Sequence, residues 1–103
     1  MMEFAFHPEA IEDLDEIYEY IDCFNSKAAD CVLDEFFAAF ESLSAMPRQG
    51  FRRTDLTAKP LRFKVVRNYL IAYAPDQNPL WIVAVVDGRR RPRVIAALLR
   101  GRE

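Results

Sequence analysis

Residues 80–88 read Leu80-Trp81-Ile82-Val83-Ala84-Val85-Val86-Asp87-Gly88, and this stretch decides the fold. Residues 80–86 are almost all apolar and rich in β-branched side chains, which is typical of a central strand covered on both faces. Asp87-Gly88 then ends the strand. The sequence on either side must supply the strands that pair with it and the helices that cover it.

Two shorter strands precede this central strand. Residues 61–65 alternate apolar and basic side chains, so one face is expected to be buried and the other to carry Arg62 and Lys64. Asn68 turns the chain into a second strand at residues 69–73, and residues 75–79 form the next turn. Such short connections predict a mostly antiparallel sheet.

Further upstream, two amphipathic helices are predicted. The apolar stripe of the first, residues 8–23, consists of Ile11, Leu14, Tyr18 and Ile21, with Ile17 beside them. The stripe of the second, residues 27–45, consists of Ala29, Leu33, Phe36, Phe37, Phe40 and Leu43, with Val32 on its edge. Asn25 or Ser26 can cap the second helix, and Met46-Pro47 ends it. The short link between the helices predicts an antiparallel hairpin.

The two ends of the chain complete the predicted fold. Residues 3–7 alternate as a short strand, and residues 94–100 form a last helix or a last strand, of which we favour the helix. The order is therefore β-α-α-β-β-β with a short C-terminal helix. We expect a single α+β domain over residues 1–103, in which the helical hairpin packs on a sheet of about four strands.

The formal net charge of −2 conceals a strong asymmetry between the two halves of the chain. Residues 1–46 hold 12 acidic side chains and one basic side chain, a net charge of −11, whereas residues 47–103 hold 4 and 13, a net charge of +9. This asymmetry indicates an acidic partner for the basic surface, or two halves that neutralise each other within one fold.

Most kinds of catalytic, metal or cofactor site are excluded by composition. The one histidine, His7, is expected to cap the first helix and only as an alternative to act as an acid or base. Cys23 and Cys31 lack metal-binding spacing and are expected to be small residues in or near the core. Three glycines cannot form a phosphate-binding loop. We therefore expect no metal and no cofactor.

No targeting or membrane segment is apparent in the sequence. The first residues, Met1-Met2-Glu3-Phe4, lack the basic and apolar regions of a signal peptide. No apolar run approaches the roughly 20 residues that span a bilayer. A cytoplasmic protein is the expectation.

Arginine side chains are the remaining groups that could carry a function. Thirteen basic residues flank the sheet strands, and Arg89-Arg90-Arg91 is the most unusual group because three arginines cannot all pair with one local carboxylate. Arginine binds phosphate or carboxylate with two parallel hydrogen bonds. The basic residues predict contacts with RNA or with an acidic protein, unless they form only a solvated face.

Segments spread over nearly the whole chain resemble the RelE/ParE toxin superfamily of bacterial type II toxin–antitoxin modules. They are Phe6-His7-Pro8-Glu9-Ala10, Asp13-Leu14-Asp15-Glu16-Ile17, Ala28-Ala29, Leu43-Ser44-Ala45-Met46-Pro47, Gly50-Phe51-Arg52-Arg53-Thr54-Asp55-Leu56, Leu61-Arg62, Tyr69-Leu70-Ile71-Ala72-Tyr73 and Val85-Val86-Asp87-Gly88-Arg89-Arg90-Arg91. The resemblance rests on their order and spacing together. It implies the helical hairpin on an antiparallel sheet that the sequence pattern also predicts.

Within this superfamily the resemblance implies two competing activities. RelE-like members cut mRNA on the ribosome, with a Tyr or His near the C-terminus, whereas ParE-like members poison DNA gyrase. Asp87 stands where relatives often have His, and the tail after Gly88 holds neither Tyr nor His, which favours the ParE-like branch and a binding poison rather than an enzyme. A RelE-like nuclease would have to use Arg52, Arg53, Lys64, Arg67 and Arg89.

Partners follow from the same resemblance. The implied partner is a cognate antitoxin, ParD-like and of the ribbon-helix-helix type, in a hetero-oligomer. The expected antitoxin-binding residues are Leu14, Tyr18, Phe37, Phe40, Tyr69 and Trp81. The expected target-binding residues, facing gyrase, are Arg89, Arg90, Arg91 and Arg93. The alternatives are the ribosome and mRNA as target, or an inactive member that only interacts or autorepresses.

Overall fold

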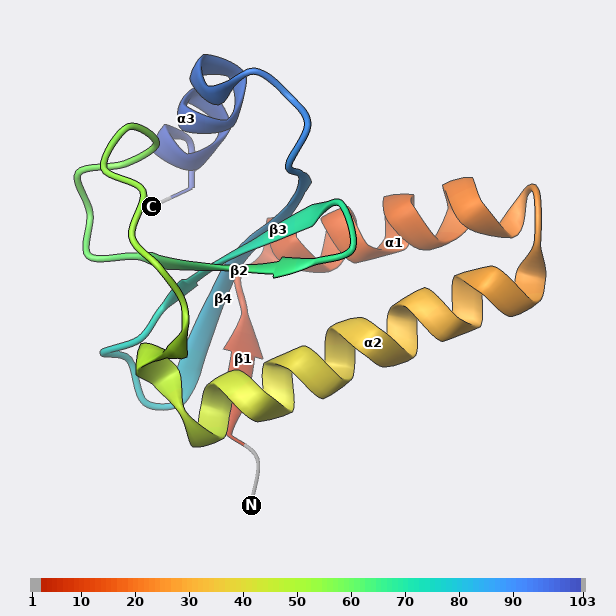
Figure 1. Ribbon diagram of the computed structural model, residues 1–103, viewed down its shortest axis with the longest axis horizontal. Coiled ribbons are helices and arrows are strands. Elements are labelled where there is room, and N and C mark those ends of the chain that lie inside the picture. Colours follow the sequence, from red (N-terminus) through yellow and green to blue (C-terminus); the bar gives the residue numbers. More distant parts are fainter. Residues whose placement is uncertain (1–2, 103) are drawn as a thin grey trace.

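The computed structural model describes residues 3–102, and its elements follow the predicted order (Figure 1). The elements are β1 (Phe4–Phe6), α1 (Pro8–Asp22), α2 (Ser26–Ala45), the 3-10 turn η1 (Pro47–Gln49), β2 (Arg62–Val66), β3 (Tyr69–Ala74), β4 (Leu80–Asp87) and α3 (Pro92–Arg100). The predicted α+β fold is confirmed, and the C-terminal segment is a helix rather than a strand.

The four strands form one mixed sheet in the order β1-β4-β3-β2. Both hairpin pairs, β2 with β3 and β3 with β4, are antiparallel, whereas β1 runs parallel to β4 with Phe6 opposite Ile82. The strand that was predicted to be central therefore lies between β1 and β3. Beyond Ile82, β4 continues after β1 has ended, so this part of its edge needs other partners.

Side chains at the helix starts explain where the two long helices begin. The Nδ1 atom of His7 accepts a hydrogen bond from the Glu9 amide at 3.0 Å, with Pro8 in the first turn. The Asn25 side chain accepts from the Ala28 amide at 3.0 Å, so Asn25, and not Ser26, caps α2. The structure thus confirms the predicted capping role of His7.

The buried stripe of α1 is rotated from the predicted one. Ala10 and Leu14 are buried, while Ile11 is 48% exposed, so its predicted place in the core is wrong. A small side chain at position 10 lets α1 lie close to the sheet, and this turns Ile11 toward solvent. On α2, Phe37 is 38% exposed for the same kind of reason, because the face that meets the sheet is centred on other residues. Those buried residues are Ala29, Val32, Phe36, Ala39, Phe40 and Leu43.

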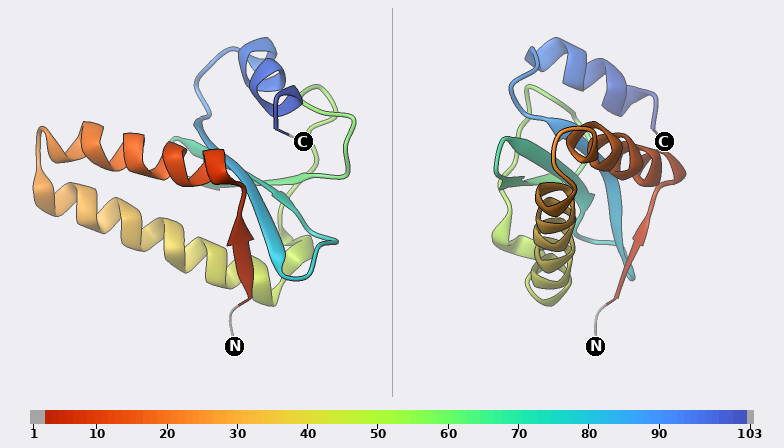
Figure 2. Two further views of the ribbon diagram at one scale, coloured as in Figure 1. Left: turned by 180° about the vertical axis from the view of Figure 1, so that it is seen from behind. Right: turned by 90° about the vertical axis from the view of Figure 1, so that its right-hand side faces the viewer.

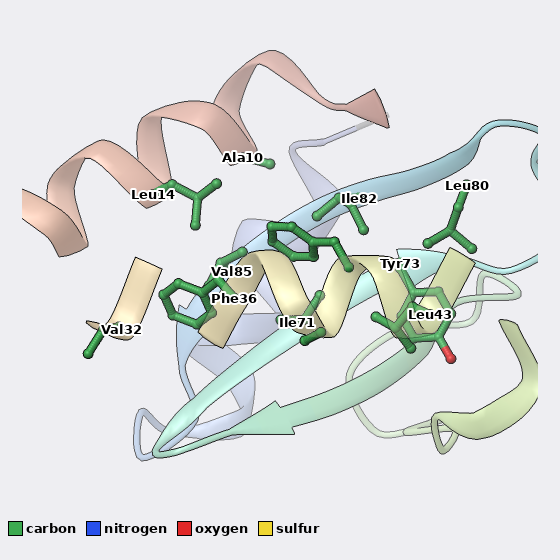
Figure 3. Close-up of a cluster of buried hydrophobic side chains, with 12 residues drawn as sticks. Ala10, Leu14, Val32, Phe36, Leu43, Ile71, Tyr73, Leu80, Ile82 and Val85 are labelled. Carbon is green, nitrogen blue, oxygen red and sulfur yellow. The ribbon is translucent and has the colours of Figure 1, made fainter. Parts of the chain in front are cut away.

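Both faces of the sheet are covered. The helical hairpin buries one face around Phe36, Ile71 and Val85 (Figure 3). Ile95 and Leu99 of α3 pack on the opposite face, together with apolar residues of the loop and the strands, which are Leu56, Leu61, Phe63, Leu70, Ala72, Val83, Ala84 and Val86. Each large side chain buried in this way stabilises the fold by roughly 1.5–3 kcal/mol.

The hairpin of α1 and α2 projects well past the edge of the sheet (Figure 2). At its tip Tyr20 and Phe24 are 67% and 77% exposed, with their ring centroids 5.4 Å apart. Cys23 and Cys31 are also exposed, so the prediction that they lie in or near the core is wrong. The physical reason is that no other layer covers this end of the hairpin. None of the helices within residues 3–102 is long and apolar enough to cross a membrane.

Candidate functional site: a basic face and an adjoining groove

The arginine run begins where β4 ends, and its first member is held by a local carboxylate. Asp87 accepts hydrogen bonds from the backbone amide of Arg89 at 2.9 Å and from its guanidinium at 3.0 and 2.8 Å. These hydrogen bonds hold the pKa of the Asp87 carboxyl well below its usual range. Arg89 is therefore neutralised within the turn and is the least available of the predicted target-binding residues.

The next arginines are not neutralised. Arg90, Arg91, Arg93 and Arg100 are exposed, and none has a hydrogen-bond or ion-pair partner among residues 3–102. Arg93 and Arg100 are seven residues apart in α3 and so share one side of that helix. We call these four residues the basic face. No side chain caps the N-terminus of α3, so the positive end of the helix dipole adds to their charge.

A buried ion pair fixes the end of the chain beneath the basic face. Arg102 is 9% exposed, and its guanidinium donates to both carboxylate oxygens of Asp13, with 2.8 Å from Nη2 to Oδ1. Arg102 also donates to the Val83 carbonyl at 3.1 Å, and Asp13 accepts from the Val85 amide at 3.0 Å. The ion pair thus provides hydrogen-bond partners for backbone groups of β4 beyond the end of β1. It also links α1 to the segment that follows α3.

A groove of about 560 Å³ opens beside this ion pair, between α1, the end of β4 and α3. Glu9, Glu12 and Glu16 of α1 line one side of it, and Arg89 and Arg90 line the other. Tyr20 and Tyr69 also reach the groove. Its walls therefore carry opposite charges, so it is not a uniformly basic channel.

The five residues predicted for a RelE-like nuclease do not meet in one place. Arg53 pairs with Asp55 at 2.7 Å, Arg67 with Glu35 of α2 at 2.6 Å, and Arg89 with Asp87. Lys64 donates to Gln49 at 3.0 Å on the hairpin side of the sheet, whereas Arg52 lies exposed in the loop. Three of the five are thus paired with separate carboxylates, and no shared phosphate site is formed among them.

The six residues predicted for antitoxin binding divide between the core and two surfaces. Leu14 and Phe40 are 7% and 0% exposed and belong to the core. Phe37 is partly exposed on the hairpin, and the Tyr18 hydroxyl donates to Asp30 at 2.7 Å, which bridges α1 and α2. Two others, Tyr69 and Trp81, are half-buried and pack with different clusters on opposite faces of the sheet.

The sequence pattern does not predict the pairing of Asp13 with Arg102. By sequence, Asp13 is one of many acidic residues on a solvated helix face, and Arg102 is one of several basic residues after the last strand. One signal was available: Asp13 directly precedes the core residue Leu14, and it therefore lies at the border of the buried stripe. Its partner is 89 residues away in the chain, so local pattern could not identify it.

Comparison with known families decides the classification. Residues 4–92 match the family model described as ParE toxin of type II toxin-antitoxin system, parDE. The chain belongs to the ParE toxin family. A search of curated proteins finds no match. The family match confirms the resemblance to the RelE/ParE superfamily and implies a cognate antitoxin, and it ends at Pro92, where α3 begins.

Proposed function

We propose that this ParE-family chain is a toxin that inhibits DNA gyrase and is neutralised by its cognate antitoxin. It acts as a binding poison in the cytoplasm and breaks no bond itself. The observation that carries this proposal is the basic face: Arg90, Arg91 and Arg93 stand exposed and unpaired among the described residues at the junction of β4 and α3. They are free to contact a target.

The covered sheet supports a gyrase inhibitor over an mRNA endonuclease. A nuclease needs cationic groups gathered around one phosphate and a group that transfers protons. The basic residues available for that work are dispersed, and α3 lies over the sheet face opposite the hairpin. The one histidine, His7, caps α1 through its Nδ1 atom, and its backbone amide donates to the Ile82 carbonyl within β4, so it does not lie among the arginines of the run.

The antitoxin of this proposal is ParD-like, of the ribbon-helix-helix type, and forms a hetero-oligomer with the toxin. Its contact surface includes the apolar residues that the hairpin leaves exposed, such as Phe37 and Tyr20. Burying them would contribute to affinity at about 25 cal/mol per Å² of apolar area removed from water. In this arrangement the hairpin meets the antitoxin and the basic face meets the target.

Induced expression in bacteria tests the proposal. We expect growth arrest with a DNA-damage response and accumulation of gyrase–DNA cleavage complexes. Replacing Arg90, Arg91 and Arg93 by Gln is expected to abolish toxicity, while antitoxin binding in a pull-down persists. Arg48→Gln, which removes an exposed arginine paired with Asp76 in a different part of the fold, serves as the control.

Two other results would contradict this proposal. Immediate loss of translation with mRNA cut in the ribosomal A site would assign the chain to the RelE-like activity. Absence of any growth effect would indicate an inactive member that only interacts or autorepresses.

A further inference from the structure

We propose that the basic face binds the phosphate backbone of duplex DNA without reading its sequence. The inference rests on the proposed function in one respect, because it identifies the polyanion that the basic face contacts when the protein acts on gyrase. The face consists of Arg90, Arg91, Arg93 and Arg100. Two of its four residues, Arg93 and Arg100, lie beyond the family match, which ends at Pro92.

The free charge of these arginines is the first reason. Other arginines of the chain, such as Arg53, Arg67 and Arg102, are paired with carboxylates within the fold. By contrast, the four residues of the basic face have no such partner among the described residues. Four exposed and unneutralised guanidinium groups around one short helix attract phosphates, which they bind with paired hydrogen bonds.

The geometry of α3 suits a linear array of phosphates. Arg93 and Arg100 lie on the same side of the helix and are separated by about 10 Å along its axis at 1.5 Å per residue. Arg90 and Arg91 precede the helix at its N-terminal end, where the backbone dipole is positive. Duplex DNA carries one negative charge for about every 1.7 Å of its axis. Arg93 and Arg100 can therefore contact separate phosphates of one duplex.

The composition of the face favours a nucleic acid over an acidic protein. Stable protein interfaces depend on anchors such as Trp, Tyr and Arg that are buried in well-packed, desolvated pockets. Residues 88–102 contain no aromatic residue, and the one large apolar side chain exposed in α3 is Val94, at 43%. The same lack of aromatic residues disfavours single strands, whose bases bind by stacking on aromatic rings. Binding to the backbone of a duplex requires neither buried anchors nor aromatic stacking.

The acidic surface of α1 disfavours binding of DNA to the hairpin. Glu12 and Glu16 line the groove across from Arg90, and together with Glu19 they repel a polyanion from α1, while the whole chain has a net charge of −2. Figure 1 shows α3 at the end of the fold away from the tip of the acidic hairpin. The hairpin would therefore point away from the duplex and remain open to other proteins.

Fluorescence anisotropy with the whole protein and a labelled 20-base-pair duplex tests this inference. Four phosphate contacts predict that the logarithm of the binding constant falls with the logarithm of salt concentration with a slope of roughly −3 to −4. The double variant Arg93→Gln with Arg100→Gln should lower the slope to roughly −2 and weaken binding about tenfold or more at low salt. The matched control, Arg48→Gln with Arg67→Gln, removes the same charge from exposed paired arginines and should stay within about threefold of wild type.

Several outcomes would overturn the inference. They are absence of duplex binding at low salt, an Arg93/Arg100 variant that binds as wild type does, and tighter binding of poly-glutamate or of single-stranded RNA than of the duplex. Circular dichroism and thermal melting confirm that each variant is folded. Supercoiling assays with gyrase on the same proteins separate the two proposals. Gyrase inhibition without duplex binding would refute this inference alone, whereas duplex binding without gyrase inhibition would refute only the proposed function.

Discussion

Arg102 and Asp13 join the end of the chain to the first helix across the edge of β4. The carboxylate of Asp13 accepts hydrogen bonds from Arg102 and from the Val85 amide, and Arg102 also donates to the Val83 carbonyl. Both side chains are withdrawn from water, with 7% and 14% of their side-chain surface exposed. Removing one partner would leave a buried charge without compensation.

We therefore expect Arg102→Met to lower the free energy of unfolding by about 3–5 kcal/mol. Urea denaturation measures this change. Arg100→Gln, an exposed position in the same tail, should change the free energy of unfolding by no more than about 0.5 kcal/mol. A wild-type unfolding midpoint in the Arg102→Met protein would show that the ion pair does not hold the tail.

Asp87 gives the fold a specific dependence on acid. Its pKa is depressed in the folded chain by hydrogen bonds from Arg89, so the stabilisation is present above the ordinary carboxyl pKa and is lost as the pH falls through the lower folded value. The difference in free energy of unfolding between wild type and Asp87→Asn should therefore shrink as the pH is lowered from 5 toward 2. Asp34→Asn, at an exposed position of α2, is the control. If the difference in free energy of unfolding stays constant from pH 5 to 2, the Asp87 carboxylate does not stabilise the fold through its hydrogen bonds with Arg89.

At the scale of elements, the sequence predicted the order and approximate ends of the helices and strands. Those ends depend on local features such as the cap at His7, the cap at Asn25 and Pro47 after α2. Which side of each helix is buried depends on how closely the helix approaches the sheet. That is why Ile11 was assigned to the core although Ala10 occupies it. Contacts between distant segments, above all between Asp13 and Arg102, cannot be predicted from any local pattern.

The loop between η1 and β2 is held to the sheet by close contact at Gly50. The Tyr73 hydroxyl accepts from the Gly50 amide at 2.9 Å and donates to the Pro47 carbonyl at 2.7 Å, and burial raises the pKa of this phenol. A Cβ atom at Gly50 would overlap the Tyr73 hydroxyl and would lie 2.6 Å from the Phe63 carbonyl oxygen. Since real Cβ atoms do not come so close, the loop or β2 would have to shift.

Gly50→Ala should accordingly destabilise the protein by about 1–3 kcal/mol, the usual cost of overpacking. Thermal unfolding followed by circular dichroism measures the loss. Gly101→Ala is the matched control: the nearest atom to its Cβ, the Leu98 carbonyl oxygen, would lie 3.5 Å away, so this variant should leave the melting temperature almost unchanged. Equal melting temperatures for both variants would refute the close packing at Gly50.

For the whole molecule, the charge asymmetry of the sequence becomes a spatial separation. The acidic residues of the first half lie mainly on α1 and α2, and Arg90, Arg91, Arg93 and Arg100, which have no partner among the described residues, lie in or just before α3. A few of the opposite charges do meet, as in the pairs of Arg67 with Glu35 and Arg102 with Asp13. Neutralisation within the fold therefore holds for these pairs, and an external acidic partner stays a prediction. An external acidic partner is proposed for Arg90, Arg91, Arg93 and Arg100.

Gyrase inhibition by the purified protein is the central claim, and a DNA cleavage assay tests it most directly. Gyrase, ATP, supercoiled plasmid and the protein are combined, and linear DNA covalently held by gyrase is quantified after detergent and protease treatment. The account predicts that wild type increases cleaved DNA, that the cognate antitoxin prevents the increase, and that replacing Arg90, Arg91 and Arg93 by Gln abolishes it. Unchanged gyrase activity together with ribosome-dependent mRNA cleavage by the same preparation would contradict it.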